Sequence, residues 1–150
     1  MKKTKDNERR LSSLIEQVQP LLQQNHTKKA LTKLKKILSI SPNHLDALVW
    51  SAEILRDIGN TEQSEKFFDK AIALDGRFLR AIHGRALLRY RLRRLPDALC
   101  DFNRLIQLRP SIPESYNNRG NVFLIIGDFK KAHADFSSAL ALNPKLASAL

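Results

Sequence analysis

The sequence predicts an all-α protein built from repeated helix hairpins. Its 150 residues are 43% hydrophobic and include only 5 glycines, and its apolar residues recur at spacings of three and four, as in an amphipathic helix. No stretch alternates apolar and polar residues for long enough to indicate a half-buried strand. Pro42, Pro110 and Pro144 stand 68 and 34 residues apart, and Gly76 occupies the intermediate position. The chain therefore has a period of 34 residues.

This period divides the chain into four repeat units at residues 11–44, 45–78, 79–112 and 113–146. Residues 1–10 form a basic N-terminal extension, and residues 147–150 begin an incomplete fifth unit. Each unit has a first small residue, a second small residue twelve positions later, and a large apolar residue four positions after that. These columns are Val18, Ala52, Ala86 and Gly120; Ala30, Ser64, Ala98 and Ala132; and Leu34, Phe68, Phe102 and Phe136. Small side chains let two helices approach, and the large side chains fill the remaining space.

A turn position lies between the two small columns and is occupied by Asn25, Gly59, Arg93 and Gly127. Asn and Gly can take the left-handed conformation that ends a helix, so each unit is predicted to be a helix hairpin. We expect first helices near residues 12–24, 46–58, 80–92 and 114–126, and second helices near 28–41, 62–75, 96–109 and 130–143. Arg93 departs from the turn pattern, and we expect an altered turn there.

These columns resemble the tetratricopeptide repeat (TPR), a helix-turn-helix unit of the same length. The fourth unit matches best, at Tyr116, Gly120, Phe123, Gly127, Ala132, Phe136, Ala139 and Pro144. The array is similar to those of scaffold and co-chaperone proteins, and its "YNNRGN" segment resembles repeats of O-GlcNAc transferases, although this sequence contains no catalytic domain. The resemblance implies a right-handed α-solenoid of antiparallel helix hairpins whose first helices line a concave groove.

Nothing in the sequence predicts catalysis. The histidines fall at unrelated phases of the repeat, and HExxH, GxSxG, P-loop and CxxC motifs are missing. The single cysteine, Cys100, excludes an internal disulfide, and an inert, partly buried thiol and a reactive one remain equally open readings. Asp97 and Asp101 are flanked by Arg94 and Arg104, which predicts ordinary surface ion pairs. We expect no catalytic residue, no metal and no cofactor.

Positive charge is concentrated in the third unit. Residues 1–10 carry +3 and the four units carry +4, −3, +6 and +1, which gives the formal net charge of +11. At 100° per residue, one stripe of the first helix contains Arg80, His83, Leu87, Tyr90 and Arg91. Arg85 and Arg89 fall instead beside the core, where we expect their methylenes to cover apolar surface while their guanidiniums reach water.

By resemblance, this stripe faces the groove together with Glu114, Asn117, Asn121 and Leu124 of the fourth unit. Guanidiniums match carboxylates, and amides can bind peptide main chain of any sequence. We therefore expect a non-catalytic module that binds a partner peptide or protein segment, with some acidic character, in its groove. The alternative reading of these side chains is a solvated surface. The family's dicarboxylate clamp for chaperone tails is matched at one of five positions, by Arg80, so that function is not expected.

Two further functions remain open from the sequence. The pI of about 10.2 and the lysines at 28, 29, 33, 35 and 36 favour a nucleic-acid-associated basic adaptor, although aromatic platforms are few and no nucleic-acid-binding fold is recognised. The chain is alternatively the regulatory TPR fragment of a larger enzyme.

The remaining expectations concern location and assembly. The N-terminus lacks the apolar core of a secretory signal, and no run of apolar residues is long enough to span a membrane. We therefore expect a cytoplasmic protein without a membrane partner. The last unit lacks a polar capping helix, which predicts either a longer array or self-association through this unit.

Overall fold

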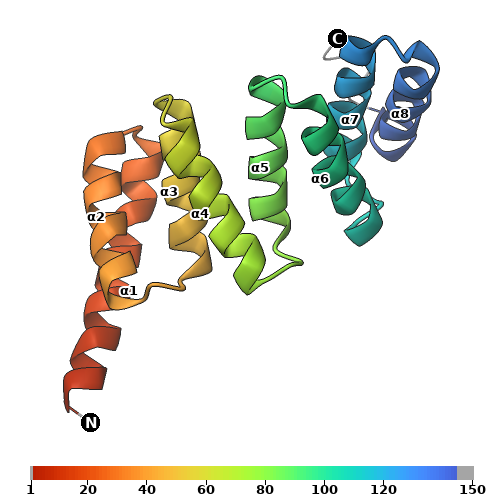
Figure 1. Cartoon of the computed structure of the whole chain (residues 1–150). Coiled ribbons are helices and arrows are strands. Elements are labelled where there is room, and N and C mark those ends of the chain that lie inside the picture. The colour runs from red at the N-terminus through yellow and green to blue at the C-terminus, as the bar shows by residue number, and fades with distance from the viewer. Residues whose placement is uncertain (1, 145–150) are drawn as a thin grey trace. The chain divides into compact units, whose positions relative to one another are not determined.

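The computed structural model describes the backbone of residues 2–144 and the side chains of residues 6–144. The regular elements of this part are helices, without a strand, which confirms the predicted all-α class (Figure 1). They are α1 (Lys2–Gln23), α2 (Thr27–Ile40), α3 (Leu45–Asp57), α4 (Thr61–Leu74), α5 (Leu79–Arg91), α6 (Leu95–Leu108), α7 (Pro113–Ile126) and α8 (Phe129–Leu142).

The helix boundaries follow the 34-residue period, except at the N-terminus. From α2 onward, each helix begins one residue before its expected range. The expected start near residue 12 is wrong, because α1 begins at Lys2 and takes up the basic extension. No glycine or proline interrupts the segment "KKTKDNERR", so nothing in it breaks the helix. The incomplete fifth unit at residues 147–150 lies outside the described residues.

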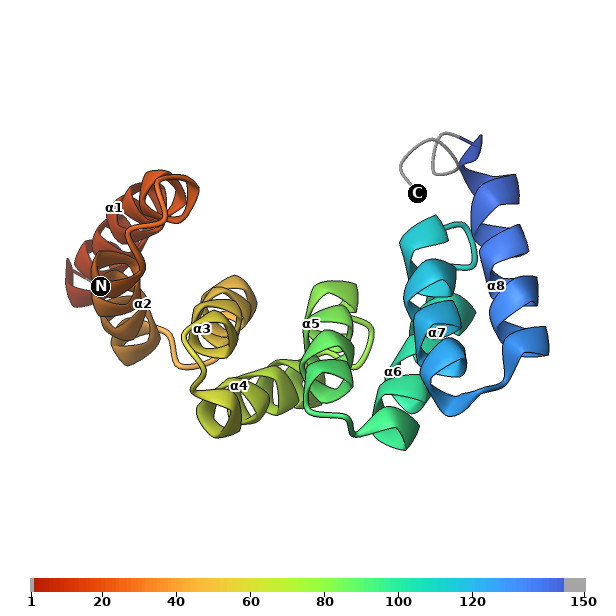
Figure 2. The ribbon, with the colours of Figure 1, turned by 90° about the horizontal axis from the view of Figure 1, so that it is seen from above.

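The chain divides into two compact units, Met1–Gly76 and Arg77–Leu150. In the first, α1 packs on α2, α2 on α3, and α3 on α4; in the second, the same order holds from α5 to α8. Figure 2 shows α3 beside α4 in one unit and α7 beside α8 in the other. Each unit is therefore two stacked helix hairpins.

Both cores are built from the columns of small and large residues. In the first unit, the core contains Leu14, Val18, Ala30, Leu34, Ile37, Ala47, Trp50 and Ile54. In the second unit, Ala86, Ala98 and Phe102 are fully buried. Gly120 lies so close to α8 that an added Cβ would stand 2.8 Å from Cε1 of Phe136. The small column is thus required by the close approach of the two helices in a hairpin.

The four turn residues share one backbone conformation. Gly59 and Gly127 have φ of 86°, Asn25 has 56° and Arg93 has 60°. The N–H of Arg93 donates to the carbonyl of Tyr90 at 3.0 Å, as the N–H of Gly59 donates to that of Arg56 at 3.1 Å. The expectation of an altered turn at Arg93 is therefore wrong: the arginine adopts the left-handed conformation that the hairpin imposes.

Candidate interaction surface on α5 and α7

The predicted stripe of the third unit lies on a single helix. Residues 80 to 91 all belong to α5, so Arg80, His83, Leu87, Tyr90 and Arg91 share one face. Arg80 and Arg91 are exposed, and the other three are half-buried. The face presents two guanidiniums at its ends, with an imidazole, an aliphatic side chain and a phenol between them.

The polar residues of the fourth unit lie on α7. Asn117 and Asn121 are half-buried, and Leu124 is 44% exposed. Both amides are therefore within reach of solvent.

A small pocket joins the start of α5 to the start of α7. Arg80 and His83 line it from one side and Glu114 and Ser115 from the other, over a floor that includes Leu105, and its volume is about 260 Å³. The remaining predicted residues of α5 lie one to two turns further along that helix. The structure thus gathers three of the nine predicted groove residues, Arg80, His83 and Glu114, around one cavity.

Asn118 was missed by the sequence reasoning. Its Nδ2 lies 3.1 Å from Nε2 of His83, so this side-chain pair connects α7 to α5. The two residues are separated by 35 positions, one more than the repeat. Asn118 follows the position equivalent to His83 in the next repeat by one residue. This spacing could have indicated the contact between the two successive first helices.

The placement expected for Arg85 and Arg89 is wrong. Nε and Nη2 of Arg85 donate to Asp101 at 3.0 and 2.7 Å, and Nη1 of Arg89 donates to the same carboxylate at 2.8 Å. Only 3% of the Asp101 side chain is exposed, against 14% and 15% for the arginines. Because α6 presents a carboxylate to both arginines, the guanidiniums bind within the hairpin instead of reaching water.

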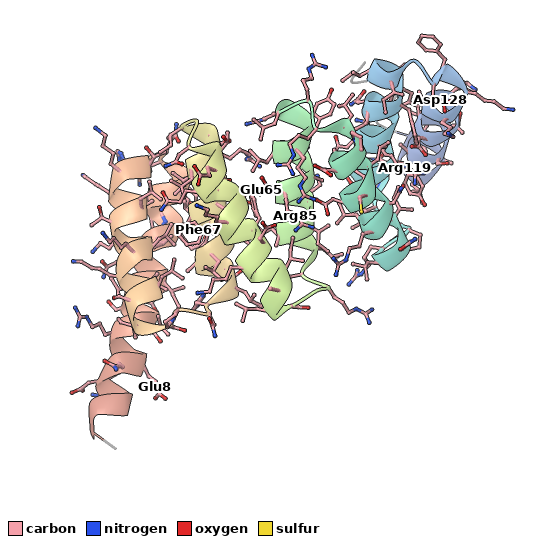
Figure 3. All side chains as sticks on the ribbon, in the orientation of Figure 1. Glu8, Glu65, Phe67, Arg85, Arg119 and Asp128 are labelled. Carbon is pink, nitrogen blue, oxygen red and sulfur yellow. The ribbon has the colours of Figure 1, made fainter. Side chains whose placement is uncertain are left out.

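The same ion pair recurs in the next hairpin. Arg119 donates to Asp135 through Nε at 2.8 Å and Nη2 at 2.7 Å, and through Nη1 to Oδ1 of Asn103 at 2.7 Å. The hydrogen bond that Arg119 donates to Asp135 raises the pKa of Arg119 despite its partial burial. Figure 3 labels Arg85 and Arg119, which are equivalent positions of α5 and α7. The two ion pairs each join the two helices of one hairpin, α5 to α6 and α7 to α8.

The other charged and reactive candidates lie on the surface. Asp97 pairs with Arg94 at 2.8 Å, and both are exposed, which confirms the surface pairing expected there; for Asp101 that expectation is wrong. Arg94 precedes α6 and does not continue the α5 stripe. Cys100 is exposed, contrary to the partly buried reading.

Two further features of the described part of the chain concern metal binding and the membrane. Within it, histidine, cysteine and carboxylate side chains form no group of three that could hold a metal ion. None of its helices combines the length and the apolar character needed to cross a membrane.

Comparisons with known proteins agree on the repeat. Two family models described as tetratricopeptide repeat match residues 21–88 and 113–146. Human tetratricopeptide repeat protein 13 is 34% identical over 89 residues, which cover 59% of this chain and 10% of that protein. Heat shock protein STI1 of Saccharomyces cerevisiae is 30% identical over 104 residues, which cover 62% of this chain and 17% of that protein. The chain thus matches a small part of each relative.

A solved structure extends the agreement to the fold. The structure of pilF from Pseudomonas aeruginosa superposes with a TM-score of 0.84 at 24% identity, and the match covers 93% of this chain and 64% of that one. At this identity the likeness concerns the arrangement of helices alone.

Proposed function

Because the chain belongs to the tetratricopeptide repeat family, whose repeats generally mediate protein–protein interaction, we propose that it is a non-catalytic module that binds an acidic segment of a partner along α5 and α7. The observation that carries the proposal is the pocket between these helices, where Arg80 and His83 stand beside the start of α7. The pocket has apolar residues, with the Arg80 guanidinium on one side and the Glu114 carboxylate on the other. The apolar part suits one side chain of the partner, and Arg80 suits a neighbouring carboxylate.

The spacing of the two exposed arginines defines the ligand further. Arg80 and Arg91 are eleven positions apart on α5, which corresponds to about 16 Å along the helix axis at 1.5 Å per residue. An extended chain covers that distance in about five residues. The preferred ligand is therefore an extended segment with two carboxylates about five residues apart, each held by a guanidinium.

The amides of α7 supply the second half of the proposed surface. Asn117 and Asn121 lie on the same face of α7, one helical turn apart. A carboxamide both donates and accepts, so each can bind the main chain of an extended segment without reading its sequence. The arginines would then choose the ligand by charge, while the amides hold its backbone.

Charge reversal of both arginines tests the proposal. The probe is a labelled Gly/Ser peptide with two glutamates at the derived spacing, and its affinity for the full chain is measured by fluorescence anisotropy. Arg80→Glu combined with Arg91→Glu should weaken binding at least about tenfold, since two charge-assisted contacts are lost and two repulsions added. Replacing the two glutamates of the peptide by glutamine should weaken binding similarly.

A matched control removes the effect of net charge. Lys36→Glu combined with Lys130→Glu makes the same change in net charge at exposed residues of α2 and α8, and it should alter affinity less than about twofold. Equal losses in the two double variants, with both folded, would overturn the assignment of the ligand to α5.

Nucleic acid is the second candidate, favoured by the lysines of α2. Lys28, Lys29, Lys35 and Lys36 are exposed on this helix. If four or five phosphates are engaged, the logarithm of the affinity should fall with the logarithm of salt concentration with a slope of about −3 to −4. An affinity for single-stranded RNA that does not change with salt would retire this candidate.

Location and self-association remain predictions. We propose a cytoplasmic location, which fractionation of cells that express the tagged chain would test. Self-association would appear as a mass that rises with concentration in light scattering, and a constant monomer mass would contradict it.

A further inference from the structure

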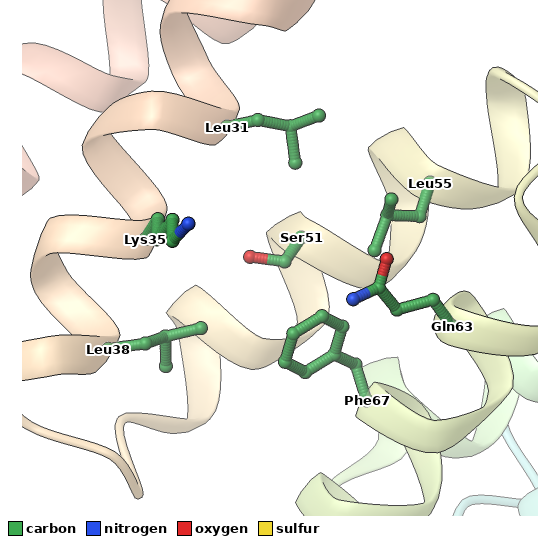
Figure 4. A pocket seen from close by; sticks show the side chains of 7 residues that line it. All are labelled: Leu31, Lys35, Leu38, Ser51, Leu55, Gln63 and Phe67. Atoms are coloured by element: carbon green, nitrogen blue, oxygen red, sulfur yellow. The ribbon is translucent and has the colours of Figure 1, made fainter.

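The first unit contains an apolar pocket that does not belong to the surface proposed above. It lies among α2, α3 and α4 and has a volume of about 360 Å³, within the range of about 300–1,000 Å³ typical of ligand sites. Leu31 and Leu38 of α2, Leu55 of α3 and Phe67 of α4 form its walls (Figure 4). Both second helices of the unit line it, whereas the family's groove is lined by first helices.

The repeat register explains why this pocket is open. Ser51 and Phe67 stand 68 residues before Arg119 and Asp135, which form the buried ion pair between α7 and α8. Ser51 is short, and its hydroxyl donates to the carbonyl of Ala47 within its own helix. No side chain from position 51 therefore reaches across to α2 as Arg119 reaches across to α6.

In the second unit, the corresponding space is filled. The Arg119 guanidinium donates to Asn103 of α6, the equivalent of Lys35, and lies 5.8 Å from the centroid of the Phe123 ring, the equivalent of Leu55. The chain's own arginine thus joins the two second helices of that unit. In the first unit, Ser51 at the same register position does not connect the two second helices.

The lining defines the chemistry of that group. The four wall residues are apolar, so the part that enters is a large apolar side chain. Figure 4 shows the Lys35 ammonium, the Ser51 hydroxyl and the amide nitrogen of Gln63 directed toward the middle of the pocket. Lys35 and Gln63 can donate hydrogen bonds to a ligand, and a carboxylate beside the apolar side chain would accept them, whereas the Ser51 proton is already donated to Ala47.

The charge of α2 selects the partner. This helix carries five lysines and no acidic residue, and Lys35 is the charged residue among those that line the pocket, so the α2 side attracts carboxylates. Helices α3 and α4 carry more acidic than basic residues, which directs the carboxylates of a bound segment toward α2. A second copy of the chain carries a net charge of +11, and repulsion between like charges argues against it as the partner. We propose that the pocket is a binding site for an acidic partner segment in which one large apolar side chain stands beside carboxylates.

A peptide series tests both parts of this chemistry. The probe is a fluorescein-labelled Gly/Ser peptide with one Phe between aspartates, titrated with the full chain carrying Arg80→Glu and Arg91→Glu, so that binding on α5 does not contribute. The Phe peptide should bind at least about tenfold more tightly than a peptide with Ala at that position or one with lysines as flanks. Equal affinity of the Phe and Ala peptides would overturn the proposal.

A pair of neighbouring lysines provides the matched variants. Both lysines are exposed, but Lys35 lines the pocket, whereas Lys36 lies 100° further round α2 and is not part of the lining. Lys35→Glu should weaken binding of the Phe peptide at least about tenfold, and Lys36→Glu by less than about twofold. Equal losses would show general attraction to the basic helix, as for nucleic acid, and would also overturn the proposal.

A third variant fills the pocket with the ion pair that the chain uses at the equivalent positions of the second unit. Ser51→Arg combined with Phe67→Asp reproduces the pair at positions 119 and 135, and a folded variant should lose binding of the Phe peptide. Retained binding in that variant would contradict the site. If the variant does not fold, the Lys35 and Lys36 comparison decides the question. Failure here leaves the α5 and α7 proposal standing, because that proposal is tested with a peptide without Phe.

Discussion

Arg85 and Asp101 form a two-pronged ion pair that joins α5 to α6 at 3.0 and 2.7 Å. Arg89 approaches the same carboxylate from one turn further along α5. The Asp101 carboxylate and the two guanidiniums lose water when they are buried, and their hydrogen bonds to one another replace it. The ion pair explains why the most arginine-rich part of the chain does not present all of its charge to solvent.

Replacing Asp101 by asparagine is expected to destabilise the chain strongly. The change leaves two largely buried guanidiniums without a counter-charge, which costs about 3–5 kcal/mol. Asp97→Asn is the matched control, because its partner Arg94 is 43% exposed and the pair contributes less than about 1 kcal/mol. Urea unfolding followed by circular dichroism measures both. Similar small losses in the two variants would contradict a stabilising role for the buried pair.

Gly120→Ala is expected to destabilise the last hairpin. The new methyl would stand 2.8 Å from the Phe136 ring, and the clash should outweigh the helix propensity gained, for a net cost of about 1–2 kcal/mol. In a Phe136→Leu background, the same alanine should cost less, since the ring edge is gone. A thermal-melt double-mutant cycle measures this coupling, and strict additivity would contradict the contact.

Arg93→Gly is expected to stabilise the chain by roughly 0.5–1 kcal/mol. An arginine at φ of 60° is strained by its Cβ, whereas glycine is not; the gain is reduced because glycine also frees the unfolded chain. Gly59→Ala should show the opposite sign, since nothing lies within 4 Å of its added Cβ and only the backbone opposes it. Denaturation midpoints check both signs, and a loss on Arg93→Gly would reveal a stabilising side-chain contact.

Asp128 is expected to titrate below its ordinary value of 3.8. The hydrogen bond from the Lys131 side chain is the main cause, and the backbone N–H of Lys131 adds to the lowering of the pKa. Because the folded pKa is lowered, the stabilisation by this carboxylate is present above pH 3.8 and is lost as the pH falls through the folded value.

Carboxyl NMR titration can separate the contributions of the two lysines. Lys131→Met should raise the pKa of Asp128 toward 3.8, and Lys130→Met should raise it less, because the influence of Lys130 is the weakest of the causes. An unchanged pKa in Lys131→Met would contradict the ion pair.

The period and the residue sizes were enough to predict the fold class and the hairpins. Gly120 and Phe136 show why: the size of each residue in a column reflects the distance between two helices of one hairpin, and that distance recurs in every repeat. The extent of α1 was not predictable from these columns, since residues before the first repeat carry no column residue. Only the absence of helix breakers there indicates that the helix continues.

The stripe of α5 was predictable from helix geometry, whereas its partners across helices were not. A helical wheel places Arg85 and Arg89 near the core, but it contains no information about which side chain of α6 lies opposite. The 16-residue separation of Arg85 from Asp101, repeated by Arg119 and Asp135, was the available signal. Both pairs share this pattern of opposite charges at a fixed separation in successive repeats.

The residue pairs at the positions equivalent to Arg85 and Asp101 differ between hairpins, and this difference affects how helices can mispair while the chain folds. Hairpins of similar length and shape can exchange helices before they settle, and repeat proteins are prone to this error. A hybrid of α3 with α6 would place the Asp101 carboxylate opposite Ser51, whereas a hybrid of α5 with α8 would again place an arginine, Arg85, opposite a carboxylate, Asp135. We therefore expect the ion pair to disfavour the first mispairing and not to distinguish the second from the native pairs of the second unit.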